Sequence, residues 1–320
     1  VPVTNMTIDP FAATVENGRI AGRGACDVKG SLAVLLCLID QLARQELKNR
    51  SQLLFSFTCD EEYGETGILD LAQSLATGGR GSTILRKLGR QPDLAIVCEP
   101  TDLHLVAAHK GTVRWKIETG GIAAHSSDPS QGQNAIYKMA RLVKSLEQDA
   151  SQLPMSREPH PLAGGPTLSV GRITGGTSVN IVPDCCSIEI DRRLAPGEQP
   201  LEAVASVEAF LNQDPDLEFR MLPPFTQAPP LSNEGNRELA EKVLGCLQHR
   251  FQEARILGVP FGTHAARLAA IGIPSLVFGP GSIQQAHTPD EWIEISQLEA
   301  AESIWQRIVQ LDLETERSPA

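Results

Sequence analysis

The sequence of 320 residues lacks long apolar runs, basic clusters and a cysteine framework, and each absence excludes a class of protein. No stretch of about 18 apolar residues occurs, so no segment predicts a membrane-spanning helix. The formal net charge is −11 and the basic residues are scattered, which argues against nucleic acid or a membrane surface as a partner. Seven cysteines, an odd number without CxxC spacing, are typical of free thiols in a reducing compartment. We therefore expect a cytoplasmic protein.

Apolar runs that alternate with helical patterns near both ends of the sequence predict an α/β domain. The leucine spacing at 30–47 predicts a helix, and a second helix is expected at 235–249. Short apolar runs at 52–58, 93–98 and 273–279 are typical of buried strands in a mostly parallel sheet. A Ser-x-x-Glu pattern that begins at residue 296 predicts the capped start of a last helix.

Between these pieces the pattern changes to the β-α-β-β-α-β order of a ferredoxin-like α+β fold. In chain order the expected elements are a strand at 112–119, a helix at 134–148, strands at 167–173 and 185–193, a helix at 200–212 and a strand at 217–222. We therefore predict one discontinuous α/β domain, residues 1–110 and 223–320, with a smaller domain inserted at 111–222. The proline-rich loop at 223–231 is expected to be the return linker.

Ionisable side chains occur where the elements of the α/β domain begin or end. Asp27 precedes the first helix, Glu61 and Glu62 follow one apolar run, Glu99 follows another, and His287 follows a third. Because ligands bind beyond the carboxyl ends of strands in such sheets, these groups are expected at one edge. Taken singly, each residue is explained by helix capping or by a solvated surface. Together they favour a site.

Crowded carboxylates repel one another, and a divalent cation relieves that repulsion. A set of one histidine and several carboxylates suits zinc, with cobalt or manganese as alternatives. Two ions about 3.5–4 Å apart can share a bridging carboxylate and a bridging hydroxide. The residues therefore predict a site for one or two divalent metal ions.

Six segments resemble the dinuclear zinc amidohydrolase and exopeptidase family of acetylornithine deacetylase, succinyl-diaminopimelate desuccinylase, glutamate carboxypeptidase and the aminoacylases. They are DPFAATVENGRIAGRGACDVKGSLA, FTCDEEYGETG, VCEPTD, GIAAHSSDPSQGQNAIYKMARL, GGTSVNIVPDCCSIEIDRRL and GPGSIQQAHTPDEWI. The resemblance spans about Val1 to Leu311 and is strongest for acetylornithine deacetylase-like members. It implies a metal-dependent hydrolase that cleaves the amide bond of an N-acyl amino acid as a step of arginine biosynthesis.

The resemblance also implies a role for each acidic residue of the predicted site. Asp27 would bridge two metal ions, and Glu61 would be the general base for the metal-bridging water. Glu62 and His287 would complete one metal site, and Glu99 would bind the other metal. A base beside activated water suits attack on an amide carbonyl near neutral pH.

Three residues of the inserted domain are implied as catalytic by the same resemblance. His125 matches a histidine that reaches the active site of a partner subunit and stabilises the oxyanion. Asn180 and Arg193 match positions that hold the substrate carboxylate or the oxyanion, and a guanidinium binds a carboxylate through two parallel hydrogen bonds. The resemblance thus implies that residues 1–110 and 223–320 form the metal-binding catalytic domain and that residues 111–222 form a dimerisation (lid) domain. The partners that it implies are a small N-acyl amino acid and a second copy of the chain, bound through the inserted domain.

The sequence departs from the family pattern in two places that concern the site. It begins at Val1, after the position where the family carries a His-x-Asp motif, so we expect that an N-terminal part is missing. Without that histidine the second metal site would keep only Asp27 and Glu99. His264 stands where related members often carry an acidic residue, and is either a substrate-side residue or an inert neighbour of a helix start.

Other functions remain open on the sequence alone. A succinyl-diaminopimelate desuccinylase, an aminoacylase or a peptidase of the same family would use the same site. A non-catalytic dimeric relative would lack one metal ligand, although retention of Glu61 argues against it. A thiol hydrolase using Cys59 or Cys98 is disfavoured, because neighbouring carboxylates raise the pKa of a thiol.

Overall fold

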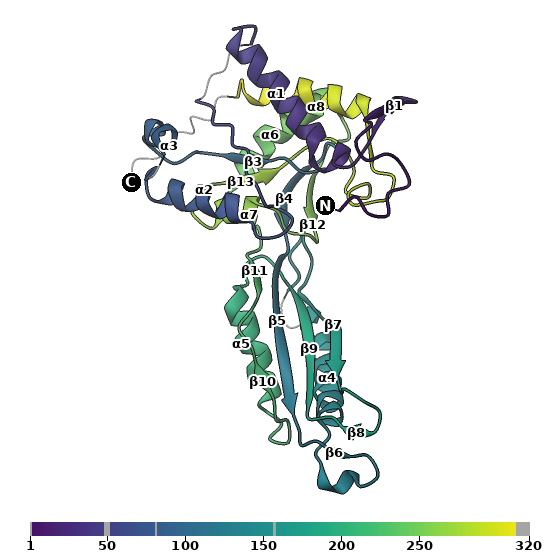
Figure 1. Cartoon of the computed structure of the whole chain (residues 1–320). Coiled ribbons are helices and arrows are strands. Elements are labelled where there is room, and N and C mark those ends of the chain that lie inside the picture. The colour runs from purple at the N-terminus through teal and green to yellow at the C-terminus, as the bar shows by residue number, and fades with distance from the viewer. Residues whose placement is uncertain (1, 48–51, 81, 156–157, 312–320) are drawn as a thin grey trace, which may run out of the picture. The chain divides into compact units, whose positions relative to one another are not determined.

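The computed structural model of the chain describes residues 2–47, 52–80, 82–155 and 158–311 (Figure 1). These residues fold as two units, each with its own core. The first unit comprises Val1–Ala107, Asn233–Gly258 and Thr263–Ala320, and the second comprises Ala108–Ser232 and Val259–Gly262. Both units combine helices with sheets, so the chain has a mixed α/β fold. None of the helices in the described part of the chain has the length and apolar composition needed to cross a bilayer.

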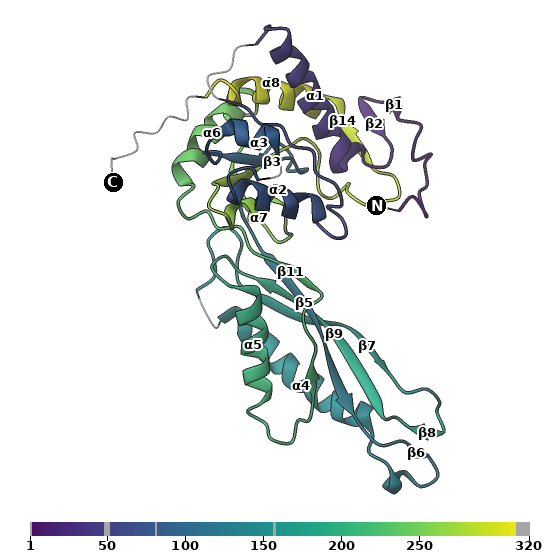
Figure 2. The same cartoon turned by 60° about the vertical axis from the view of Figure 1, so that its left-hand side comes forward.

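The first unit has a four-stranded sheet of order β12-β4-β13-β3, a three-stranded sheet of order β1-β2-β14, and helices around them. Its helices are α1 (Gly30–Ala43), α2 (Thr66–Ala76), α3 (Thr83–Leu88), α6 (Arg237–Arg250), α7 (Ala265–Ala269) and α8 (Ile295–Ile308). Its strands are β1 (Thr14–Glu16), β2 (Arg19–Ala21), β3 (Ala95–Val97), β4 (Leu105–His109), β12 (Ile256–Val259), β13 (Ser275–Val277) and β14 (Trp292–Glu294). Figure 2 shows α6 and α8 on one side of the strands and α2 and α7 on the other.

The pairing of β3 with β13 positions the site. These strands are parallel, in the register Ala95 with Ser275, so the loops that follow them leave the sheet at the same edge. The next strand, β4, runs antiparallel to β13, so the sheet is less uniformly parallel than the sequence predicts. The reason is the short connection at 98–104, because a parallel crossover needs about a dozen residues or more.

Two local predictions for the first unit are wrong. Residues 52–58 form no strand, and in the part of the chain that the structure describes they have no ladder partner. An apolar run becomes a strand only where a neighbouring backbone completes its hydrogen bonds. The last helix begins at Ile295 with Glu294 as its N-cap residue. Ser296 therefore lies inside the first turn, and the expected capping box does not form.

The second unit consists of a sheet with two helices packed against it. Its strands are β5 (Gly111–Gly120), β6 (Ala124–His125), β7 (Thr167–Gly175), β8 (Ile181–Val182), β9 (Cys185–Leu194), β10 (Arg220–Met221) and β11 (Thr226–Ala228), and its helices are α4 (Ala135–Gln152) and α5 (Pro200–Leu211). Single 3-10 turns occur at Pro129–Gln131 and Leu153–Met155. The sheet order β10-β5-β9-β7 and the chain order β5-α4-β7-β9-α5-β10 are the predicted ferredoxin-like arrangement.

Strict alternation along β5 and β9 explains why this sheet has one apolar face. Val113, Trp115 and Ile117 are fully buried against α4 and α5, as are Ile188 and Ile190 of β9. Their neighbours in sequence point to the opposite, polar face, because successive side chains of a strand alternate. The predicted linker at 223–231 is not wholly irregular, since β11 within it pairs antiparallel with β5.

Candidate metal centre

Asp27 lies in the helical turn Ala25–Lys29 that leads into α1. The turn is irregular, since Asp27 has φ −118° and ψ 92° and its peptide bond to Val28 is cis. The Lys29 ammonium donates to the carbonyl of Arg23 at 2.8 Å and so closes the turn on its other side. Its side chain thus supports the loop that carries Asp27.

His287 lies in the loop that joins β13 to β14, and this loop packs directly on the Asp27 turn. The Cys26 thiol donates to the carbonyl of Ser282 at 3.2 Å. Gly281 has φ +90°, and a Cβ there would lie 2.5 Å from the sulfur of Cys26. Only glycine therefore allows the two loops to approach this closely.

Glu61 and Glu62 lie in a tight loop before α2. The N–H of Glu65 donates to the carbonyl of Asp60 at 2.7 Å, and the Thr66 hydroxyl donates to Oδ2 of Asp60 at 3.1 Å. Asp60 thus ties both ends of the loop together with its backbone and its side chain. From α7, Arg267 donates through Nε to the Glu65 carboxylate at 2.9 Å. The loop is thereby fixed at its base, and the two glutamates project from it.

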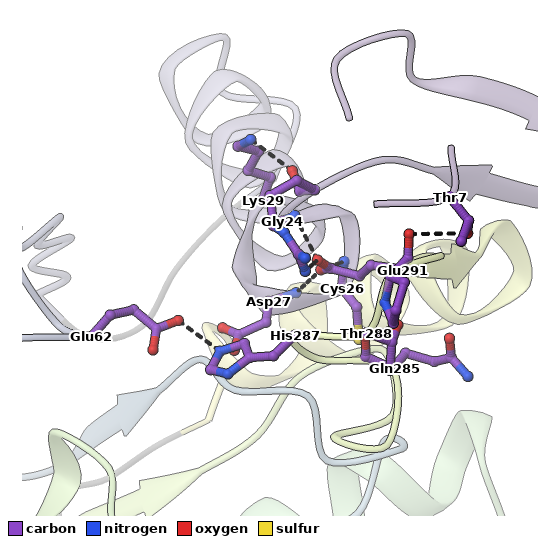
Figure 3. A network of polar contacts seen from close by, with 12 residues as sticks. Thr7, Gly24, Cys26, Asp27, Lys29, Glu62, Gln285, His287, Thr288 and Glu291 are labelled. Atoms are coloured by element: carbon purple, nitrogen blue, oxygen red, sulfur yellow. Dashed lines mark hydrogen bonds and ion pairs between the residues drawn. The ribbon is translucent and has the colours of Figure 1, made fainter. Parts of the chain in front are cut away.

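Asp27, Glu62 and His287 come together although they lie far apart in sequence (Figure 3). Nε2 of His287 lies 2.8 Å from Oε1 of Glu62 and 3.3 Å from Oδ2 of Asp27. One ligand atom from each of the three residues lies within 4.8 Å of the other two. This donor set of one imidazole and two carboxylates fits a divalent cation such as zinc.

Glu99 follows β3 and is held next to the start of α1. The hydroxyl of Thr101 donates to the carbonyl of Gly279 at 3.1 Å, which joins the loops after β3 and β13. A Cβ on Gly279 would lie 2.6 Å from the carbonyl oxygen of Glu99 and 2.8 Å from the hydroxyl of Ser31. The close packing of these three segments places Glu99 near the other carboxylates.

The electrostatics of the site are dominated by repulsion between carboxylates. Desolvation, followed by the charges of Glu62 and Asp27, raises the pKa of Glu61 to about 7. Desolvation and the charge of Glu62 also raise the pKa of Asp27, although His287 opposes this. Burial and the charges of Asp27, Glu61 and Glu62 raise the pKa of Glu99 well above its usual range. Four acidic groups therefore share one field, which a divalent cation would neutralise.

The other three predicted catalytic residues, His125, Asn180 and Arg193, belong to the second unit. His125 pairs with Ile181 across the β6–β8 ladder, and its Nδ1 lies 2.7 Å from the hydroxyl of Ser127. The carbonyl of Asn180 accepts a hydrogen bond from the N–H of Ser126 at 3.0 Å. The structure therefore brings His125 and Asn180 into neighbouring turns, both exposed.

Arg193 lies on the polar face of β9, away from these turns. Its Nε donates to Oδ1 of Asp191 at 2.8 Å, and its Nη1 donates to the hydroxyl of Thr112 at 3.0 Å. Arg192 points to the buried face, where it pairs with Glu198 at 2.8 Å. Of the two adjacent arginines, Arg193 is the more accessible.

The remaining candidates are found in defined but separate surroundings. His264 is buried as the N-cap residue of α7, with Nδ1 3.4 Å from the hydroxyl of Thr58, and burial lowers its pKa. Burial and the charge of Glu99 raise the pKa of the Cys98 thiol to about 12. A thiol with that pKa is not a nucleophile near neutral pH, which argues against the thiol hydrolase. Cys59 is exposed.

One residue of the site was not singled out by sequence reasoning. Glu291 lies four positions after His287 and is 1% exposed, with its carboxylate turned toward the Asp27 turn. Three of its four donors are backbone N–H groups, which no sequence pattern displays. The only available signal is a carboxylate directly before the apolar residues Trp292 and Ile293 of a short strand.

Comparison with known proteins shows what the chain as a whole is similar to. The model of peptidase family M20/M25/M40 matches residues 1–311. An acetylornithine deacetylase from Buchnera aphidicola subsp. Schizaphis graminum is 29% identical over 311 residues, which cover 95% of this chain and 75% of that protein. The solved M20 family metallo-carboxypeptidase Sso-CP2 from Sulfolobus solfataricus is similar with a TM-score of 0.70 at 19% identity, covering 96% of this chain and 81% of that one. The solved aminopeptidase PepT from Bacillus cereus is similar with a TM-score of 0.68 at 19% identity, covering 92% of this chain and 74% of that one. At these identities the two structures show a shared fold.

Proposed function

The chain belongs to peptidase family M20/M25/M40 and is a hydrolase of that family, and we propose that it removes the acyl group from an N-acyl amino acid, specifically N-acetylornithine. The observation that carries this proposal is the convergence of Asp27, Glu62 and His287 beside Glu61. The similarity to a protein named acetylornithine deacetylase supports the choice of substrate. That substrate would place the chain in arginine biosynthesis in the cytoplasm.

The residues at the centre divide into ligands and a base. Asp27, Glu62 and His287 would hold one divalent ion, and Asp27 with Glu99 would hold a second. Zinc fits this set best, with cobalt or manganese as alternatives. When bound, the metal supplies a Lewis acid that polarises the amide carbonyl and lowers the pKa of water.

Glu61 moves the protons of the reaction. Its carboxylate accepts a proton from the attacking water as the new carbon–oxygen bond forms, and later donates that proton to the departing amine as the carbon–nitrogen bond breaks. A carboxylate beside metal-activated water is suited to both transfers near neutral pH. The products are the free amino acid and the carboxylate of the acyl group.

The second unit contributes binding groups and the contact between two copies of the chain. His125 stabilises the oxyanion in the partner's site, and Asn180 and Arg193 orient the substrate carboxylate or the oxyanion. The edge of the sheet supports dimer formation. β7 pairs only with β9 among the described strands, and its outer edge can extend the sheet with a second copy.

Metal content and hydrolysis, measured together on three variants, test the proposal. The wild-type protein should contain a divalent metal and release ornithine from N-acetylornithine. Glu61→Gln should keep the metal but lose turnover by about 10²–10⁴-fold, because it removes a proton acceptor. Glu62→Gln should lose metal, because it removes a ligand. Glu241→Gln is the matched control, since Glu241 pairs only with exposed Arg237 on α6 in the described contacts.

Each outcome decides a separate part of the proposal. Equal loss of metal in Glu61→Gln and Glu62→Gln would contradict the division into base and ligand. Hydrolysis of other N-acyl amino acids or peptides, but not N-acetylornithine, would refute the substrate. A wild-type protein without metal and without hydrolysis of any of them would refute the function.

A further inference from the structure

Glu291 places a carboxylate in the interior of the first unit, directly behind the turn that carries Asp27. The N–H groups of Cys26 and Asp27 each donate to its Oε1 at 2.9 Å. The N–H of Gly24 and Nη1 of Arg23 each donate to its Oε2 at 2.8 Å. Four donors therefore converge on one side chain that is 1% exposed.

A buried carboxylate is costly unless its oxygens are fully hydrogen-bonded and its charge is balanced. Glu291 meets both conditions. Each of its oxygens has two donors, and the Arg23 side chain, which is itself only 10% exposed, supplies the balancing positive charge. This arrangement also leaves neither oxygen directed toward the metal ligands. Glu291 is therefore suited to hold the loop in place and not to bind the ion.

The bonds to Oε1 act on the backbone of the proposed metal ligand itself. Asp27 and Val28 have non-helical φ and ψ angles, so the turn is not shaped by regular helical hydrogen bonds at this point. The N–H groups of Cys26 and Asp27 instead find their acceptor in a residue more than 260 positions away. The shape of the turn thus depends on a side chain from the other end of the unit.

Glu291 also ends the segment that carries His287. Its own carbonyl accepts a hydrogen bond from the N–H of Gly22 at 2.9 Å, which adds a backbone bond between the same two segments. Figure 3 shows the Glu291 carboxylate against the Asp27 turn, with His287 and Asp27 on the far side of that turn. One residue therefore fixes the distance between two of the three ligands.

We infer that Glu291 is a positioning residue, which holds Asp27 opposite His287 and so sets the affinity of the centre for its metal. This inference rests on the proposed function, because it takes Asp27 and His287 as ligands. Residues that orient metal ligands without touching the ion are worth about 10–100-fold in metal affinity. We expect an effect of that size.

Glu291→Gln is the informative substitution. The amide has the same length as the carboxylate, but its NH2 group faces two donors whichever way it turns, so two of the four hydrogen bonds are lost. With Co²⁺ as the probe, we expect dissociation constants about 10–100-fold weaker than wild type and an altered visible absorption spectrum of the bound ion. Turnover at saturating metal should recover toward the wild-type value, because Glu61 is untouched.

Glu294→Gln is the matched control. Glu294 lies three positions further along the chain, at the end of β14, and pairs with exposed Arg19. Its substitution should leave Co²⁺ affinity unchanged. Hydrogen exchange of the metal-free proteins adds a readout that needs no ion. The backbone amides that lose their acceptor, either those of Cys26 and Asp27 or that of Gly24, should exchange faster in Glu291→Gln only. A general loss of structure would instead increase exchange throughout the unit.

The outcomes separate this inference from the proposed function. A Glu291→Gln protein that binds Co²⁺ as tightly as wild type, with unchanged exchange at Gly24, Cys26 and Asp27, would overturn the inference. A wild-type protein that binds no Co²⁺ would refute the metal site, while the exchange data would still report whether Glu291 shapes the turn. If Glu291→Gln does not fold, Glu291→Asp tests the inference instead. The shorter side chain keeps the negative charge but cannot reach all four donors. Wild-type affinity in that variant would equally overturn the inference.

Discussion

Glu99 illustrates what the crowding of carboxylates means for a single residue. Its half-buried carboxyl group lies in the field of Asp27, Glu61 and Glu62, and desolvation together with these charges raises its pKa well above the usual range. Without a cation, the fold therefore retains protons at this residue that the unfolded chain would release. Binding of a divalent ion reverses this preference, so metal uptake releases protons and strengthens as the pH rises.

The metal-free protein should lose stability as the pH rises from about 5 to about 8. Ordinary Asp and Glu pKa values are about 3.9 and 4.3, whereas the pKa of Glu61 is about 7 and those of Asp27 and Glu99 are also raised. Over this range the folded state binds more protons than the unfolded state, so the free energy of unfolding falls. The contribution of these carboxyl groups to the free energy of unfolding is complete at pH values below their pKa in the unfolded chain. It is lost as the pH rises through their pKa in the folded protein. Melting temperatures in the presence of a chelator measure this.

Glu99→Gln provides the comparison for this prediction. An uncharged amide cannot ionise, so the fall in melting temperature with pH should be smaller than in wild type. Glu241→Gln on the surface of α6 should retain the wild-type dependence. Identical slopes for wild type and Glu99→Gln would show that the carboxylate cluster does not govern the pH dependence.

At the scale of single elements, α4 has the best-defined start in the structure. The Asn134 side chain accepts hydrogen bonds from the N–H groups of Ile136 at 2.9 Å and Tyr137 at 3.1 Å. These donors have no partner within the helix. Asn134→Ala should therefore lower the free energy of unfolding by about 1 kcal/mol, measured by urea denaturation. Asn134→Asp keeps the acceptor and should retain most of the stability, so equal losses in both variants would contradict the capping role.

Elements of the second unit were predictable because their signal is local. The alternation of apolar and polar residues in β5 and β9 sets both their extent and their buried face, and the amphipathic pattern of α4 does the same. The chain order of these elements then leaves few topologies. The fold class and the ferredoxin-like order were predicted correctly for this reason.

The errors concern elements whose structure depends on distant partners. Residues 52–58 have a strand-like composition but no ladder partner among the described residues, and β11 forms in a supposed linker because β5 offers it one. The start of α8 was misplaced because Glu294 of β14 is its N-cap residue, so the helix follows the strand without a loop. Local composition carries no information about any of these neighbours.

The same distinction applies to the candidate site. The rule that ligands gather at the carboxyl ends of parallel strands grouped Asp27, Glu62 and His287, and the structure places them together although the run before Glu62 forms no strand. Glu291 could not be assigned a role in this way, because three of its four donors are backbone N–H groups far away in sequence. The role of Glu61 as general base and that of Glu99 as metal ligand stay predictions.

At the scale of the whole molecule, the proposed role of His125 makes the dimer the unit of catalysis. His125 is exposed at β6, and its Nδ1 contacts Ser127. We therefore expect His125→Ala to lower turnover without changing the metal content, because an oxyanion donor is removed but no ligand. Metal analysis and initial rates on the same preparation measure this, and loss of metal in His125→Ala would contradict the assignment.

Mixed dimers test whether His125 acts across the interface. When His125→Ala and Glu61→Gln subunits are unfolded together and refolded, half of the dimers should be mixed. If His125 acts in trans, each mixed dimer has one site with both residues intact, so the sample should recover about a quarter of wild-type activity. If His125 acts within its own subunit, every site carries one defect, and activity stays at the level of the parents. Each variant refolded alone is the control, and absence of recovery in a sample shown to contain mixed dimers would refute action in trans.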